Sequence, residues 1–145
     1  MTGGADEGVY FITGKDFTNA GAASSSLKKL LEDRGVPADI VRRFSIAAFE
    51  AEMNAIIYAV AGMMRYSITR DMVKVTLQDM GPGIPDISLA MTEGYSTAPD
   101  YIREMGFGSG MGLPNIKKNV DHMTITSVVG EGTTLEFDIA LSPSP

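Results

Sequence analysis

The sequence predicts one compact domain of the α/β class. Its 145 residues suit a single domain, and 44% of them are apolar, which is enough to build a buried core. Short β-type runs alternate along the chain with segments that carry helical periodicity, and no internal repeat is visible. We therefore expect a single domain over residues 9–141, with flexible tails at 1–8 and 142–145.

The first part of the chain predicts a strand followed by two helices. Residues 9–13 form a β-type run, and a helix is expected over 19–32, with Gly35 where a helix stop belongs. Pro37 suits the first turn of a longer helix over 37–61. On one face of that helix, apolar residues recur at three- and four-residue steps, namely Ile40, Phe44, Ala47, Ala51, Ala55 and Ala59.

A hairpin and a long glycine-rich loop follow. Residues 64–69 and 72–78 predict two strands around the two-residue turn Arg70-Asp71. The segment 79–112 has no long periodic element, and such a loop inside a compact domain tends to be functional. Beyond it we expect a helix over 114–120 and two closing strands, 123–129 and 133–141, joined by the turn 130–132.

Composition argues against several classes of function. The chain has no cysteine, which removes disulfides, thiolate catalysis and thiolate metal sites, and its only histidine, His122, is expected to be structural. A formal net charge of −6 disfavours a nucleic-acid partner. We see neither a signal peptide nor an apolar run approaching the roughly 20 residues of a membrane span, so we expect no membrane partner and a cytoplasmic location.

The first motif with chemical content lies in the middle of the long helix. Glu50 and Asn54 are four residues apart, so they share one helix face. A carboxylate and an amide among apolar neighbours are costly unless they are paired or bind something. The alternative interpretation is the solvated face of an amphipathic helix, on which charged residues simply stay exposed.

Three glycine-containing motifs follow. Residues 79–84, Asp-Met-Gly-Pro-Gly-Ile, end a strand with glycines that let a ligand approach, beside a carboxylate that can accept from an exocyclic amine; a tight turn is the alternative. Residues 106–112 place repeated glycine before a helix, which favours phosphate binding by backbone N–H groups, although a ligand-free loop is the alternative. Residues 130–134 alone predict only a hairpin turn.

Taken in order, these four motifs resemble the Bergerat (GHKL) ATP-binding fold of gyrase, Hsp90, MutL, histidine kinases and anti-sigma kinases. The resemblance covers about residues 9–141. It implies an α/β two-layer sandwich, in which a mixed, mostly antiparallel sheet has helices on one face and a glycine-rich ATP lid. The stretches DMGPGIPDI, EGYST and GMGLPNIKK look most like the anti-sigma-factor serine/threonine kinases, especially the stressosome-associated switch kinases.

The resemblance also implies roles for individual residues. Glu50 is similar to the family's general base, Asn54 to the residue that holds magnesium, and Asp79 to the carboxylate that specifies adenine. Arg103 is the only fixed positive charge in the lid and is expected at the γ-phosphate, with a solvated loop residue as the alternative. The other residues that the resemblance assigns to nucleotide binding are Gly81, Gly83, Ile84, Gly106, Gly108, Gly110, Met111, Gly112 and Thr133.

One departure from the family is Tyr58, which stands where many anti-sigma kinases carry a histidine.

The resemblance implies a serine/threonine kinase that uses ATP and Mg²⁺ as cofactors and phosphorylates a STAS-type anti-sigma antagonist, with a sigma factor as a further partner. A module in which ATP only sets the conformation of the lid is the alternative. A histidine-kinase catalytic domain is weakened because we find no dimerisation helix with an acceptor histidine. Kinases of this kind often pair, so a homodimer stays open.

Overall fold

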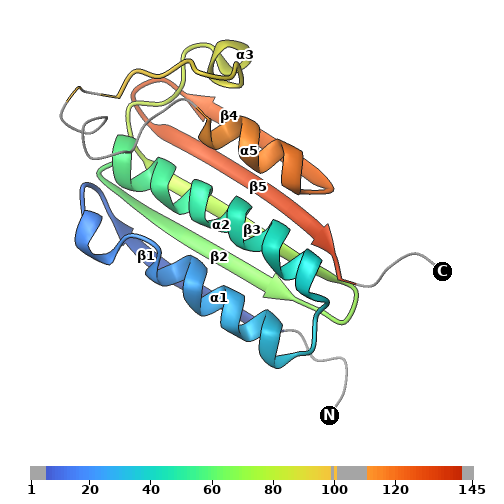
Figure 1. Ribbon diagram of the computed structural model, residues 1–145. Coiled ribbons are helices and arrows are strands. Elements are labelled where there is room, and N and C mark those ends of the chain that lie inside the picture. The colour runs from blue at the N-terminus through green and yellow to red at the C-terminus, as the bar shows by residue number, and fades with distance from the viewer. Residues whose placement is uncertain (1–5, 99, 101–110, 142–145) are drawn as a thin grey trace.

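The computed structural model describes residues 6–98, 100 and 111–141, and in these residues a five-stranded sheet has helices on one face (Figure 1). The strands lie in the order β1-β2-β3-β5-β4, and each neighbouring pair is antiparallel. The predicted two-layer α/β fold is confirmed, but these strands form no parallel pair, so the sheet is antiparallel and not mixed. The strands are β1 (Asp6–Thr13), β2 (Ala61–Ile68), β3 (Met72–Met80), β4 (His122–Val128) and β5 (Gly132–Ala140).

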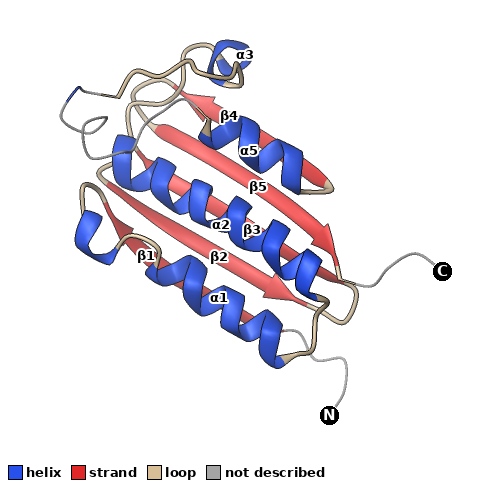
Figure 2. Cartoon of the chain, in the orientation of Figure 1, coloured by secondary structure: helices blue, strands red, loops and turns tan. Residues whose placement is uncertain are grey.

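The helical layer lies on one side of this sheet (Figure 2). α2 crosses its middle, with α1 beside it over β1 and β2 and α5 over β4 and β5. No helix in the described part of the chain is long and apolar enough to cross a membrane. The helices are α1 (Ala22–Asp33), α2 (Ala38–Tyr58), α3 (Ile87–Ala90) and α5 (Gly112–Asn119), with a 3-10 turn, η1, at Phe17–Asn19.

Several element boundaries differ from those expected, among them the starts of α1, β1 and β2 and the end of α2. α1 begins at Ala22 because the 3-10 turn η1 takes residues 17–19, where the helix was expected to start. α2 ends at Tyr58, and the next residue is already extended with φ −102° and ψ 165°. β1 begins at Asp6, so residues 6–8, expected in a flexible tail, pair with β2.

The short helix α3 was not predicted within the loop 79–112. The side chain of Asp86 caps it by accepting a hydrogen bond from the backbone N–H of Leu89 at 3.0 Å. Such a cap satisfies one of the N–H groups that have no partner at a helix start. The four residues of α3 are too few to show helical periodicity, which explains why this helix could not be predicted.

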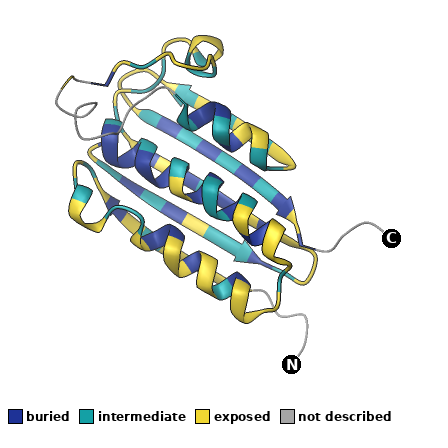
Figure 3. Cartoon of the chain, in the orientation of Figure 1, coloured by how far each residue is buried: buried dark blue, intermediate teal, exposed yellow. Residues whose placement is uncertain are grey.

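The core lies between the helices and the sheet. Buried residues alternate along β3 and β5, and the buried face of α2 meets them (Figure 3). Ala47 and Ala51 are fully buried, and such small side chains let the helix come close to the sheet. Phe44 packs against Phe137 with ring centroids 6.0 Å apart. Because α2 is fixed this firmly, its C-terminal half can hold polar side chains in defined positions.

Glu52 is a buried carboxylate that fastens α1 to α2. Its Oε2 accepts from the N–H of Gly21 at 3.0 Å and of Ala23 at 3.4 Å, and its Oε1 accepts from the N–H of Ser24 at 3.0 Å. These N–H groups belong to the first turn of α1, which otherwise lacks a side-chain cap. The negative charge also faces the positive end of the helix dipole.

Replacing Glu52 by Gln should therefore lower the free energy of unfolding by about 2–3 kcal/mol, because buried N–H groups of α1 would lose their charged acceptor. Denaturant unfolding followed by circular dichroism measures this. Glu32→Gln, at an exposed position on α1, is the control and should change stability by less than about 0.5 kcal/mol. Equal stability of the two variants would contradict a capping role for Glu52.

Candidate functional site

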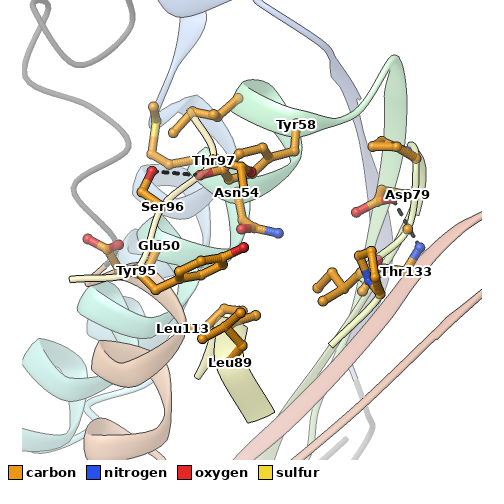
Figure 4. Close-up of a pocket in the computed structure, with 18 of the residues that line it drawn as sticks. Glu50, Asn54, Tyr58, Asp79, Leu89, Tyr95, Ser96, Thr97, Leu113 and Thr133 are labelled. Atoms are coloured by element: carbon orange, nitrogen blue, oxygen red, sulfur yellow. Dashed lines mark hydrogen bonds between the residues drawn. The ribbon is translucent and has the colours of Figure 1, made fainter. Parts of the chain in front are cut away.

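A cavity of about 430 Å³ opens beside the C-terminal half of α2 (Figure 4). α2, the end of β3, the segment 82–97, the start of α5 and the start of β5 supply its walls. The structure thus brings together side chains from segments far apart in the sequence. The residues expected in the site that line the cavity are Glu50, Asn54, Asp79, Gly83, Ile84, Gly112 and Thr133.

Two expected site residues that the structure describes, Gly81 and Met111, do not line this cavity. Gly81 follows β3 directly, and Met111 precedes the first residue of α5. Both lie next to residues that do line it. Arg103, Gly106, Gly108 and Gly110 lie outside the described residues.

α2 supplies the polar groups at one end of the cavity. Glu50, Asn54 and Tyr58 follow one another at four-residue intervals, so all three lie on the cavity side of the helix. Burial raises the pKa of the Glu50 carboxyl above its usual value of 4.5. Within the described residues no hydrogen bond or ion pair occupies that carboxylate, so it can accept a proton from a molecule in the cavity.

Asp79 supplies the carboxylate at the other end. It is only 8% exposed, and its Oδ1 accepts from the backbone N–H of Thr133 at 3.1 Å. Burial raises the pKa of Asp79, and the N–H groups of Thr133 and Gly81 act against that rise by stabilising the charged form. One carboxylate oxygen is turned toward the cavity in Figure 4, where it can accept from a ligand.

Ser127 fixes the loop after β3 beside Asp79, and the sequence analysis missed it. Its hydroxyl lies 2.8 Å from that of Thr133, donates to the carbonyl of Gly132 at 3.1 Å, and accepts from the N–H of Ile84 at 2.7 Å. Ser127 faces Thr133 across the β4–β5 ladder. Only the register of that hairpin reveals the contact, so the sequence offered no signal for it.

The lining residues other than the expected ones were not predicted either. They are largely apolar, and the slot that they form suits a flat, weakly polar group such as a nucleobase. Of the segment EGYST that carried part of the family resemblance, Tyr95, Ser96 and Thr97 line the cavity. The full set of unpredicted lining residues is Phe49, Met53, Ile57, Tyr58, Pro82, Pro85, Asp86, Leu89, Ala90, Tyr95, Ser96, Thr97 and Leu113.

Two glycines are required where the site loops approach one another. Gly83 has φ +78°, and a Cβ there would lie 2.5 Å from the carbonyl oxygen of Val128. Gly132 has φ +142°, and a Cβ there would lie 2.1 Å from the carbonyl oxygen of Asp79. Neither position can take a side chain without moving the backbone that carries the cavity.

Gly132→Ala should displace Asp79 and destabilise the fold by about 3 kcal/mol or more, since it combines backbone strain with a direct clash. Gly130→Ala is a matched control in the same turn, because Gly130 has φ +85° but no atom within 4 Å of an added Cβ. The control should cost only the strain, about 1–2 kcal/mol. Thermal unfolding compares the stability of the two variants. Equal losses of stability would show that the clash with the carbonyl oxygen of Asp79 makes no contribution.

His122 lies outside this site. It is at the start of β4 and does not line the cavity. Its side chain is exposed, and Nδ1 lies 2.8 Å from Oδ1 of Asp138. The hydrogen bond and negative charge of Asp138 raise the pKa of His122. This contact agrees with the structural role expected for the only histidine.

The residues around the cavity fit a magnesium ion held together with phosphates. Mg²⁺ prefers oxygen ligands and commonly takes one or two from the protein, with the rest from water and phosphate. Asn54 offers an amide oxygen next to the Glu50 carboxylate on the same helix face. The described residues contain no cluster of three or more His, Cys, Asp or Glu side chains that could hold a metal ion.

This fold and cavity are those of a nucleotide-binding domain of the histidine kinase-like ATPase class. The family model described as "Histidine kinase-like ATPase domain" matches residues 15–139. The chain therefore belongs to this family, and the resemblance inferred from its motifs is confirmed.

The relatives point to one branch of that family. The chain is 35% identical over 98 residues to "Serine/threonine-protein kinase RsbT" of Bacillus subtilis, covering 65% of this chain and 68% of that protein. It is 29% identical over 112 residues to "Anti-sigma F factor" of Anoxybacillus flavithermus, covering 77% of this chain and 70% of that protein. One relative is thus named as a serine/threonine-protein kinase and the other as an anti-sigma factor, in agreement with the branch of the family that the motifs resembled.

A solved structure supports the fold alone. "Mycobacterial sensor histidine kinase MprB" superimposes with a TM-score of 0.55 and 17% identity, covering 99% of this chain and 100% of that chain. At this identity the similarity concerns only how the elements are arranged.

Proposed function

We propose that the chain is a cytoplasmic, ATP-dependent serine/threonine protein kinase that phosphorylates a STAS-type anti-sigma antagonist in a partner-switching pathway. The observation that carries the proposal is the single cavity with Glu50 and Asn54 at one end and Asp79 and Thr133 at the other. The names of the relatives, a serine/threonine-protein kinase and anti-sigma F factors, support the reaction class and the pathway.

Asp79 is the group that would recognise adenine. Its Oδ1 is already engaged by the N–H of Thr133, and the oxygen turned toward the cavity is an acceptor for an exocyclic amine. The apolar walls between the two ends, including Met53, Ile84 and Leu113, provide a slot for the base.

Asn54 and Glu50 would act at the phosphate end. Asn54 would hold magnesium through its amide oxygen, and the bound metal supplies charge neutralisation for the phosphates. Glu50 would accept the proton of a partner's serine or threonine hydroxyl as that oxygen attacks the γ-phosphorus and the bond to the β–γ bridging oxygen breaks. We propose that Gly112, at the start of α5, and the preceding glycines cover the phosphates.

Phosphorylation would then change which proteins remain bound. A phosphoryl group adds about two negative charges to the partner, and in a contact surface such a change breaks the complex through repulsion and desolvation. The cycle is therefore binding, phosphorylation and release. We extend the proposal to a sigma factor as a second partner and to a homodimer as the working form.

The test is incubation of the purified chain with γ-labelled ATP, Mg²⁺ and STAS proteins encoded beside it. We expect phosphoserine or phosphothreonine on one of them, identified by mass spectrometry. ATP binding by calorimetry with no transfer to any of these proteins would instead favour a module that uses ATP only to set its conformation. Size-exclusion chromatography with light scattering tests the homodimer.

A further inference from the structure

Tyr58 is the last residue of α2 and differs from the histidine expected there by family resemblance. It stands one helical turn beyond Asn54 and two beyond Glu50, and all three line the cavity. Its ring is partly buried against the hydrophobic core, which holds the side chain in place. The hydroxyl at the tip of a fixed ring is a well-positioned hydrogen-bonding group.

That hydroxyl contacts the segment formed by residues 95–98, which we call the anchor segment. The Oη of Tyr58 lies 3.3 Å from the Oγ of Ser96 (Figure 4). This hydrogen bond joins α2 to a segment that lies 38 positions further along the chain. The same Ser96 oxygen accepts from the N–H of Ala98 at 3.1 Å. Ser96 is thus bound both to α2 and to its own segment.

In the anchor segment, hydrogen-bonded or buried residues alternate with exposed ones. Ala98 is 5% exposed and belongs to the hydrophobic core, whereas Tyr95 and Thr97 are exposed side chains that line the cavity. The Tyr58–Ser96 hydrogen bond is therefore a direct link between this wall of the cavity and the helix that carries Asn54 and Glu50.

We propose that Tyr58 is a positioning residue whose hydroxyl, by holding Ser96, keeps the anchor segment against the cavity and slows the release of bound nucleotide. This inference rests on the proposed nucleotide site and adds to it a residue that acts through another residue. The hydroxyl need not touch ATP. A single hydrogen bond between uncharged groups changes an equilibrium constant by about two- to tenfold, which is the size of effect expected.

The test uses Tyr58→Phe and Ser96→Ala, each of which removes one hydroxyl and leaves the packing in place. Stopped-flow measurements with a fluorescent ATP analogue and Mg²⁺ should show dissociation about two- to tenfold faster in either variant. The double variant should be no faster than the faster single variant, because both substitutions break the same bond. Ser96→Thr, which keeps a hydroxyl, should restore slow dissociation.

A merely structural role would not give this pattern. Tyr66→Phe removes a hydroxyl from β2, outside the residues that line the cavity, and should leave dissociation unchanged. Thermal unfolding of Tyr58→Phe should match that of the wild type, so that a faster release reports on the site and not on loss of fold. Slow dissociation in Ser96→Thr would likewise show that the hydroxyl at position 96 is required, and not only the packing of the side chain.

Two results would overturn the inference while leaving the proposed function intact. One is a Tyr58→Phe variant that releases the ATP analogue at the same rate as the wild type. The other is a double variant whose acceleration equals the product of the two single effects, which would mean that the hydroxyls act independently. If the wild-type chain bound no ATP analogue at all, the proposed function would fail and this inference with it.

Discussion

Glu50→Gln is expected to slow phosphoryl transfer to the partner protein by about 10²- to 10⁴-fold while ATP affinity stays close to that of the wild type. The glutamine keeps the size and place of the side chain on α2 but cannot take up the proton of the attacking hydroxyl. Single-turnover transfer of labelled phosphate measures the rate of phosphoryl transfer, and calorimetry measures the affinity for ATP separately. Asp39→Asn, at an exposed position in the first turn of α2, is the control and should retain full activity.

The pH dependence gives an independent test of the same role. Burial raises the pKa of Glu50 above 4.5, and a general base works only when it is deprotonated. The acid limb of the kcat/KM profile should therefore lie at higher pH than an ordinary glutamate would give. Full transfer by Glu50→Gln, or an unchanged acid limb in that variant, would remove Glu50 from the chemistry.

Elements with long periodic patterns could be predicted from the sequence. The long helix was expected over 37–61 because its apolar residues repeat over many turns, and the structure has it over the slightly shorter range Ala38–Tyr58. The same periodicity put Glu50 and Asn54 on one face, and that face does line the cavity. The order of strands and helices followed from the same kind of signal, whereas the two-layer fold class followed from family resemblance.

Contacts that depend on tertiary packing could not be predicted. Glu52 lies two residues from Glu50, yet it caps α1, because the approach of α1 to α2 brings N–H groups to it. Ser127 reaches Thr133 only through the register of the β4–β5 hairpin. Sequence spacing carries information about one element at a time, whereas both contacts depend on how two elements meet.

Asp79→Asn is expected to weaken ATP binding by about 10- to 100-fold, since hydrogen bonds to charged groups contribute about 1.5–3 kcal/mol. The amide oxygen can still accept from the N–H of Thr133, but the amide NH₂ would then face the cavity. There it would meet the exocyclic amine of adenine, which is also a donor. Isothermal titration with ATP measures the loss, and Asp71→Asn, in the exposed turn between β2 and β3, should bind as the wild type does.

The same substitution should change which base the site prefers. Guanine carries a carbonyl oxygen where adenine carries its amine, so the new amide NH₂ could donate to it, and the ratio of ATP to GTP affinity should fall. Loss of fold is not expected, because burial already disfavours the charged form of Asp79 and asparagine carries no charge. If ATP and GTP both bound more weakly by the same factor, Asp79 would not distinguish adenine from guanine. Adenine recognition would then have to be sought elsewhere in the cavity.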